Sequence, residues 1–275
     1  MGSLTERRQA YVRSGIRLGG AVGAACSLLM AAPAAQPVDT LCGATIVADL
    51  KLDHDVVCAG DGLIAGADGI WIDLNGYALS GSGVGVGIAI TSHRDITISG
   101  GTIANFAAGI RTLAATDVDV KHVEFAGNPE GIDFQAGSIG NSIKENVFRD
   151  STIRGIMLRS NSKENDIKNN TFINNRLGIL VFGGVDNTIK QNEISGSALV
   201  GIRINVIATG NVLRDNAVSS SAVGIEFLVT PTGSAQGNDL RGNTLSTNGC
   251  GLKGPTSGNT LKDNVYFDNT ADTCS

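Results

Sequence analysis

The chain has 275 residues, of which 42% are hydrophobic and only 4% aromatic, and its formal net charge is −5. This length and hydrophobic content suffice for a folded core and exclude a disordered chain. Its 37 glycines, about 13% of the chain, are nearly twice the usual share of about 7%, whereas proline is scarce, which excludes collagen-like and proline-rich sequences. We therefore expect a globular protein with many tight, repeated turns.

Residues 1–34 have the features of an export signal. A stretch with four arginines precedes an apolar run from Leu18 to Ala32, and Ala32-Pro33-Ala34 has the small residues of a cleavage site. The apolar run is too short, and too rich in glycine and alanine, for a membrane span of about 20 residues. We predict a signal peptide over 1–34, a secreted or periplasmic protein, and no transmembrane segment after signal removal; the general and twin-arginine export routes both stay open.

The charge of the mature chain disfavours nucleic acid as a partner. Removing the signal removes four arginines and one glutamate, so the net charge changes from −5 to −8. A protein that binds nucleic acid nonspecifically carries a basic patch and a basic balance instead. We therefore expect no nucleic-acid partner.

Four cysteines remain in the mature chain, one pair near each end: Cys42 with Cys58, and Cys250 with Cys274. An exported chain with two separated local pairs most simply forms two disulfides. Neither pair has the close spacing of a zinc or redox site. We predict both disulfides as clamps on the two ends of the fold.

The middle of the chain is a repeat of 22 to 24 residues marked by the dipeptide Gly-Ile. Each unit also contains the pattern Asn-x-Ile/Leu-x-x-Asn, as in Asn165 to Asn170, followed by alternating apolar residues. These short alternations predict three very short strands per unit. The dipeptide begins at Gly87, Gly109, Gly131, Gly155, Gly178, Gly201 and Gly224, and an eighth copy, Gly251-Leu252, follows after an insertion at residues 230–234.

Three short strands in about 23 residues bury their apolar side chains only by coiling, so that each strand pairs in parallel with its equivalent in the next unit. Equivalent residues then stack at about 4.8 Å. We predict an interior isoleucine ladder and an asparagine ladder, with the asparagines in the left-handed conformation and bonded to those above and below.

This pattern, over roughly residues 68–269, resembles the right-handed parallel β-helix of pectate-lyase-like proteins, in particular the repeat-rich branch that includes the periplasmic copper-maturation protein of nitrous oxide reductase. The expected fold is all-β, a single-stranded right-handed parallel β-helix of about nine coils with disulfide-clamped end caps. We divide the chain into the signal at 1–34, an N-terminal cap at 35–66, coils at 67–249, and a last coil and C-terminal cap at 250–275.

The first cap is rich in aspartate, at Asp49, Asp53, Asp55, Asp61, Asp68 and Asp73. Such a cluster suits Ca²⁺, but an acidic sheet edge also prevents aggregation, and we favour the second interpretation. Trp71, the only tryptophan, points outward in an early coil and could stack on a sugar. We expect the first cap to cover it.

In the resembling enzymes, the active site follows the outer face of the first strand of successive coils. The resemblance implies a catalytic group of Asp133, Arg111 and Arg159, in which the carboxylate removes a proton beside a uronate carboxylate and the arginines neutralise that carboxylate. It also implies substrate contacts from Gln135, Arg203, Asn205 and Glu226. The alternative is that these opposite charges only stabilise neighbouring strands, and we favour it.

Two further sites are candidates. Glu130, Asp133 and Asp150 could gather a Ca²⁺ ion, the one cofactor that the sequence suggests. Seven cations also share one position after the apolar residue of the second strand, a spacing that suits an acidic polysaccharide or lipid headgroups. We include Lys144, Lys168 and Lys190 among the substrate-binding candidates, although solvated lysines also keep a surface soluble. The seven are Lys121, Lys144, Lys168, Lys190, Arg214, Arg241 and Lys262.

Two functions stay open. The first is lyase-like or epimerase-like chemistry on a polysaccharide, in particular an acidic one, and the second is a noncatalytic β-helix that binds glycan, the cell envelope or a protein. A compact group of Asp133, Arg111 and Arg159 within reach of one sugar favours catalysis. An even spread of salt bridges favours binding.

Overall fold

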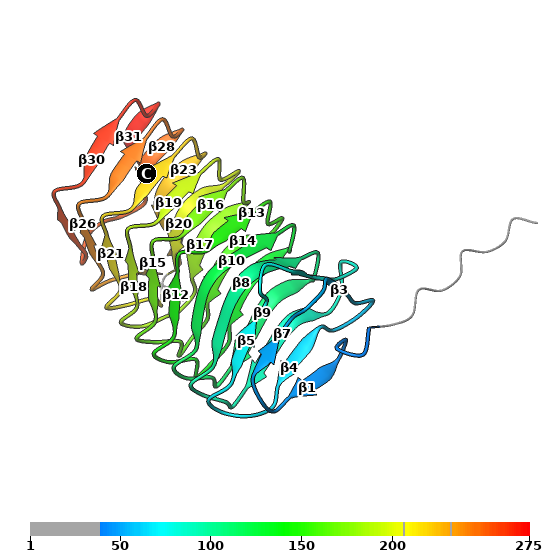
Figure 1. Ribbon diagram of the computed structural model, residues 1–275. Helices are drawn as coiled ribbons and strands as arrows, with labels where there is room; N and C mark the ends of the chain where they lie inside the picture. The colour runs from blue at the N-terminus through cyan, green and yellow to red at the C-terminus, as the bar shows by residue number, and fades with distance from the viewer. Residues whose placement is uncertain (1–38, 206, 232) are drawn as a thin grey trace, which may run out of the picture. The chain divides into compact units, whose positions relative to one another are not determined.

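The computed structural model describes residues 39–205, 207–231 and 233–275, and the predicted signal peptide lies outside them. The described residues form parallel β-strands and turns, and none of them is helical. Successive coils stack along one axis, with each strand beside its equivalent in the next coil (Figure 1). The predicted right-handed parallel β-helix is confirmed.

Sheet A, as we name it, contains one strand from each coil and has eleven strands, which gives about ten coils rather than the nine predicted. The difference arises because β1 and β4, in the segment expected to be a cap, pair in register with the sheet. Its strands are β1 (Ala44–Ile46), β4 (Leu63–Ala65), β7 (Val86–Thr91), β9 (Ala108–Leu113), β11 (Glu130–Phe134), β14 (Arg154–Leu158), β17 (Leu177–Val181), β20 (Val200–Ile204), β23 (Val223–Phe227), β28 (Cys250–Lys253) and β31 (Ala271–Cys274).

The other parallel strands form two rows. Sheet B contains β2 (Leu50–Lys51), β5 (Trp71–Asp73), β8 (Thr97–Ala104), β10 (Asp119–Ala126), β12 (Ser142–Lys144), β15 (Asp166–Lys168), β18 (Thr188–Lys190), β21 (Val212–Arg214), β26 (Asp239–Arg241) and β29 (Thr260–Lys262). Sheet C contains β3 (Val56–Val57), β6 (Ala78–Ser80), β13 (Val147–Arg149), β16 (Thr171–Ile173), β19 (Glu193–Ser195), β22 (Ala217–Ser219), β27 (Thr244–Ser246) and β30 (Val265–Phe267), and it is continuous with sheet B through β8 and β10. The insertion forms a small antiparallel hairpin of β24 (Val229–Thr230) and β25 (Gly233–Ser234).

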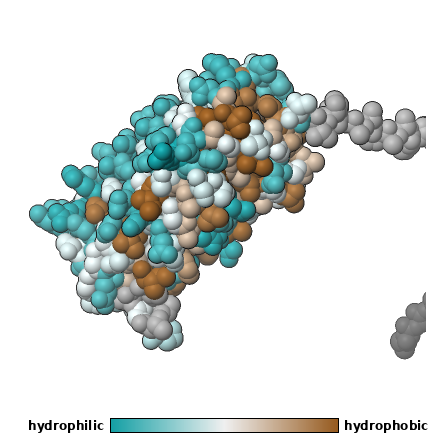
Figure 2. Space-filling view, turned by 90° about the horizontal axis from the view of Figure 1, so that it is seen from below, coloured by the Kyte–Doolittle hydropathy of each residue, from teal (hydrophilic) through white to brown (hydrophobic). Residues whose placement is uncertain are grey.

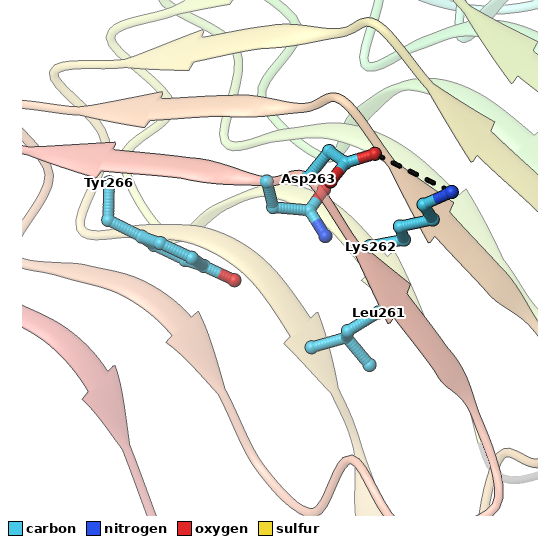
Figure 3. A pocket seen from close by; sticks show the side chains of 5 residues that line it. Leu261, Lys262, Asp263 and Tyr266 are labelled. Atoms are coloured by element: carbon cyan, nitrogen blue, oxygen red, sulfur yellow. Dashed lines mark ion pairs between the residues drawn. The ribbon is translucent and has the colours of Figure 1, made fainter.

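Both predicted disulfides are present, Cys42–Cys58 in the first coil and Cys250–Cys274 between the last two strands of sheet A. The segments expected as caps are thus the end coils themselves. At the C-terminal end a hollow of about 280 Å³ is lined by Leu261, Lys262, Asp263, Asn264 and Tyr266 (Figure 3). Of the residues that the sequence analysis places in candidate sites, it holds only Lys262, the last cation of the predicted ladder.

The core repeats from coil to coil. The isoleucine after each repeat glycine, from Ile88 to Ile225, is fully buried. Phe125, Phe148 and Phe172 stack in a second ladder, with ring centroids 4.7 and 4.8 Å apart. The repeat glycine is required by close approach, since a Cβ on Gly131 would lie 2.4 Å from the carbonyl oxygen of Gly155 and 2.7 Å from the Phe148 ring.

Buried asparagines join the coils. The Oδ1 of Asn170 accepts hydrogen bonds from the backbone N–H and the Nδ2 of Asn146, one coil earlier, at 3.0 and 3.1 Å. Equivalent bonds join Asn141, Asn165, Asn187 and Asn211, so each coil contributes one asparagine to each of two ladders that run along the stack. The predicted stacking bonds are confirmed, but the predicted left-handed asparagines are wrong, because the residue before each one, such as Glu145 or Asn169, has the positive φ.

A third, mixed ladder escaped the sequence interpretation because serine interrupts it: Asn128, Ser151, Asn175, Ser197, Ser221, Asn248 and Asn269. In the first coils, aspartates satisfy backbone groups instead. Asp49, Asp55 and Asp61 each accept a backbone N–H from the next coil, at 2.8 Å. These carboxylates are therefore structural caps on strand ends.

Candidate functional site

The candidate site is the outer face of sheet A. Glycine and isoleucine of each repeat are buried, and the residues that flank this pair project outward. Asp133 on β11 lies between Arg111 on β9 and Met157 on β14, in register. This stacking arises from the repeat length alone, since 22 and 24 residues separate these three positions.

The three predicted catalytic residues come together. The carboxylate of Asp133 accepts two hydrogen bonds from Arg159, from Nε at 2.7 Å and from Nη2 at 3.1 Å, and lies 3.6 Å from Nε of Arg111. Gln135 donates to the same carboxylate at 3.2 Å. The hydrogen bond that Arg159 donates to Asp133 raises the pKa of Arg159 above its ordinary value. The Asp133 side chain has no exposed surface, whereas Arg111 and Arg159 are 37% and 40% exposed.

Glu130, three residues before Asp133 on β11, is also held by arginines. Its carboxylate lies 2.8 Å from Nη2 of Arg154 and 4.0 Å from Nη2 of Arg111. Asp150, the third residue of the predicted calcium set, pairs with Arg149 at 3.2 Å. The structure does not bring that set together, because arginines occupy its carboxylates, and among the described residues no three His, Cys, Asp or Glu side chains could hold a metal ion.

A second ionic cluster lies further along the face. Glu226 on β23 pairs with Arg203 at 2.5 Å and with Lys253 at 3.3 Å, and only 7% of its side chain is exposed. Arg203 and Glu226 were predicted, and Lys253 was missed because it follows the atypical Gly251-Leu252 copy of the repeat. Asn205, also predicted, is buried just after β20.

Between the two ionic clusters the face is apolar. Met157, Leu177, Leu180 and Val200 form a small buried cluster separate from the core inside the coils. Phe182, which follows β17, is 41% exposed beside it. The outer face of sheet A therefore alternates ionic, apolar and ionic along the stack. The wider surface likewise shows hydrophobic patches separated by hydrophilic ones (Figure 2).

The predicted cation ladder lies on sheet B, away from these clusters, and it is in register as expected. The structure pairs its cations with carboxylates. Asp119 lies 2.9 Å from Lys144, and Asp166 lies 3.3 Å from Lys168 and 3.2 Å from Lys190. Burial opposes ionisation of Asp119, but hydrogen bonds from Lys144 and Ser142 prevail and lower its pKa.

Comparison with known proteins identifies the family. A family model described as "Periplasmic copper-binding protein (NosD)" matches residues 68–235, well over half of the chain. The chain belongs to the NosD family. None of the curated proteins compared matches it significantly. This membership, with the two disulfides, confirms the predicted secreted or periplasmic location.

Several solved structures resemble this NosD-family chain in fold. An alginate lyase from Paenibacillus sp. str. FPU-7 is 16% identical, with a TM-score of 0.59, over 82% of this chain and 99% of that one. The periplasmic alginate epimerase AlgG is 15% identical, with a TM-score of 0.60, over 83% and 73% of the two chains. A tailspike protein of E. coli bacteriophage HK620, solved with a pentasaccharide, is 10% identical, with a TM-score of 0.59, over 76% of this chain but only 48% of the tailspike.

The residues that the structure describes do not fit the copper that the family description implies. Copper prefers thiolate, thioether and imidazole ligands. The four described cysteines are all in disulfides, and His54, His93 and His122 lie in different coils, each paired with a carboxylate. Met157 is buried beside Arg154.

In the same described part of the chain, no helix is long and apolar enough to cross a membrane.

Proposed function

We propose that this protein binds an acidic polysaccharide in the periplasm or outside the cell, along the outer face of sheet A. The observation that carries the proposal is the asymmetry of its ionic clusters. The side chains of the carboxylates Asp133, Glu130 and Glu226 are 0%, 11% and 7% exposed. Three of the cations that pair with them, Arg111, Arg159 and Lys253, keep more than a third of their side-chain surface in solvent.

Such a face offers positive groups in fixed positions. A guanidinium that is oriented by one carboxylate still has N–H groups on its outer edge, and these suit the carboxylates of a uronate polymer. Because the internal partner fixes the arginine rotamer, little further side-chain entropy is lost on binding. The face carries five cations and three carboxylates in these clusters, so it is locally positive although the chain is acidic.

The apolar region between the clusters suits the carbon-bound faces of sugar rings. Asp133 and Arg203 are three coils apart, about 14 Å at the usual strand spacing, which is room for several sugar units. The exposed ring of Phe182 lies within this interval and could stack on one of them. Charged ends with an apolar centre favour a polymer over a small anion.

Lyase-like or epimerase-like chemistry is the second candidate, and the compact group of Asp133, Arg111 and Arg159 favours it. The fold of an alginate lyase and an alginate epimerase is also similar. Against it, both oxygens of Asp133 accept from Arg159 or Gln135 and the carboxylate has no exposed surface. A general base must reach the proton that it removes. The burial of Asp133 and the hydrogen bonds that already occupy its carboxylate therefore support binding first.

One experiment separates the two. Binding of the mature protein to alginate, pectate and hyaluronan is measured by calorimetry at increasing salt, and unsaturated products are followed by ultraviolet absorbance in the same mixtures. The variants are Asp133→Asn and the double variant Arg111→Gln/Arg159→Gln, with Arg214→Gln on sheet B as the matched control. Arg214 is 64% exposed, and among the described ion pairs it pairs only with its neighbour Asp215. Its replacement therefore removes one positive charge from the protein without changing the candidate site.

The proposal expects binding that weakens with salt, at least tenfold loss in the double variant, and a much smaller change in Asp133→Asn, which loses the ordering of the two arginines but also removes a negative charge beside them. Equal affinity of the double variant and wild type for every polymer would refute binding at this face. Product formation that disappears in Asp133→Asn would instead establish the lyase candidate.

A further inference from the structure

A second exposed feature lies on sheet B, away from the proposed polysaccharide face. Trp71, the first residue of β5 and the only tryptophan in the chain, has 47% of its surface exposed. We expected the first cap to cover it, and among the described residues no such cover exists, because that segment forms a coil of its own. The large aromatic side chains Phe125, Phe148 and Phe172, in contrast, are fully buried inside the coils.

One hydrogen bond fixes the indole ring, and another fixes the backbone that carries it. Its Nε1 donates to the Oγ of Ser99 at 2.7 Å, and the backbone N–H of Trp71 donates to Oδ1 of Asp49 at 2.8 Å. Trp71 pairs with Thr97 of β8 in the next coil, so Ser99 lies two residues beyond the position directly beside Trp71. To bond with Ser99, the indole must lie across the outer surface of β8. One face of the indole then covers the sheet and the other faces solvent, which agrees with its exposure of about half.

Polar groups surround this ring. Lys51 and Asp73, which lie side by side on β2 and β5, form an ion pair at 3.2 Å, and Lys51 is 65% exposed. Asp49 and Thr97 occupy the positions directly before and after Trp71 in the stack. An outward aromatic face is thus bordered by both hydrogen-bond donors and acceptors, with opposite charges that compensate each other.

We propose that Trp71 is a stacking platform for a neutral hexopyranose unit of a glycan, in a second binding site independent of sheet A. One side of a pyranose ring presents C–H groups that pack on an aromatic face, while its equatorial hydroxyls point sideways toward hydrogen-bonding groups. Lys51, which is 65% exposed, donates to such hydroxyls, and the exposed carboxylate of Asp49 accepts from them. The mixed charge of this border does not favour a polyanion, in contrast with the positive face of sheet A.

The single tryptophan gives a direct assay, because all indole fluorescence of the protein comes from this site. The mature protein is titrated with oligomers of glucose, mannose and N-acetylglucosamine, and with an alginate oligomer. Affinities for the same ligands are measured by calorimetry for wild type, Trp71→Ala and Ser99→Ala. Phe267→Ala is the matched control, since Phe267 is also exposed, at 46%, but lies at the other end of the stack.

The proposal expects a saturable change in emission with at least one neutral oligomer, at least tenfold weaker binding for Trp71→Ala, and a severalfold loss for Ser99→Ala, which frees the ring. Phe267→Ala should bind like wild type. Absence of any emission change with all three neutral oligomers, or unchanged affinity in a folded Trp71→Ala protein, overturns it. Alginate binding that leaves the emission unchanged belongs to sheet A, so either site can fail without the other.

Discussion

Replacing Asn170 by alanine tests whether the asparagine ladders hold the coils together. Asn170 is 1% exposed, and its side chain takes part in four hydrogen bonds to neighbouring coils. Its Oδ1 accepts from the N–H and Nδ2 of Asn146, and its Nδ2 donates to the carbonyl of Ile143 at 2.9 Å and to Asn192 at 3.1 Å. Alanine leaves the buried N–H of Asn146 and the carbonyl of Ile143 without these partners.

A buried polar group that loses its partner costs about 1 to 3 kcal/mol, so two such backbone groups give an expected loss of about 2 to 6 kcal/mol in the free energy of unfolding. The matched control is Asn264→Ala, in the last coil of the same ladder. Asn264 makes equivalent bonds to Asn243 and to the carbonyl of Leu240, but it is only partly buried, and water from the open end can replace it. Its expected loss is below about 2 kcal/mol.

Guanidinium unfolding followed by circular dichroism measures both variants, and amide hydrogen exchange locates the effect. In Asn170→Ala the N–H of Asn146 should exchange much faster than in the wild type. If the two variants lose the same stability within about 1 kcal/mol, or if exchange at Asn146 does not change, these bonds are not what joins the coils and the reasoning is wrong.

Three further predictions concern other positions. The Oγ of Ser197 is buried without a partner in the third ladder, so Ser197→Asn should raise the free energy of unfolding by about 1 kcal/mol in guanidinium unfolding; a loss would show that the coil cannot admit the larger side chain. Gly131→Ala should lower it by about 3 kcal/mol or more, because the added Cβ meets the next coil, and a melting temperature like that of the wild type would contradict this. Hydrogen bonds to Asp39 and then Asp53 raise the pKa of His54 above 6.5, so its contribution to the first coil is complete below about pH 6.5 and is lost as the pH rises through the folded-state pKa. A nuclear magnetic resonance titration should give that raised pKa and show it fall in Asp39→Asn, and an unchanged value would remove the assigned cause.

The repeat made the fold predictable, because one constraint acts on every coil. Gly131 must approach the next backbone, and Ile132 must fill the interior, so the same dipeptide returns at each turn. The end coils were less predictable. β1 to β4 lack the Gly-Ile and asparagine signals, and there aspartates such as Asp49 bond the strand ends that asparagines bond elsewhere.

The register of the candidate site residues was predictable, but their ionic pairing was not. A fixed repeat length places Arg111 beside Asp133, and the sequence shows that much. Whether Asp133 bonds mainly to that neighbour or to Arg159, just after β14 in the next coil, depends on side-chain rotamers, and the structure gives Arg159 the closer contact, 2.7 Å against 3.6 Å. The spacing of a repeat specifies strand register but not the direction of long side chains.

The two cationic arrays on this molecule illustrate why register alone does not identify a binding surface. On sheet B, Asp166 lies on the same strand as Lys168 and one coil from Lys190, and it is 30% exposed, so cations and carboxylate meet solvent to the same extent. On sheet A, Asp133 is fully buried beneath guanidinium groups that are more than a third exposed. An approaching anion meets balanced charges on sheet B but mainly positive charge on sheet A, because a carboxylate below the surface orients arginines without competing for the ligand at their outer edge. The relative depth of the two signs of charge therefore distinguishes the faces, and this is why we propose sheet A, and not the more regular lysine ladder, as the face for a polyanion.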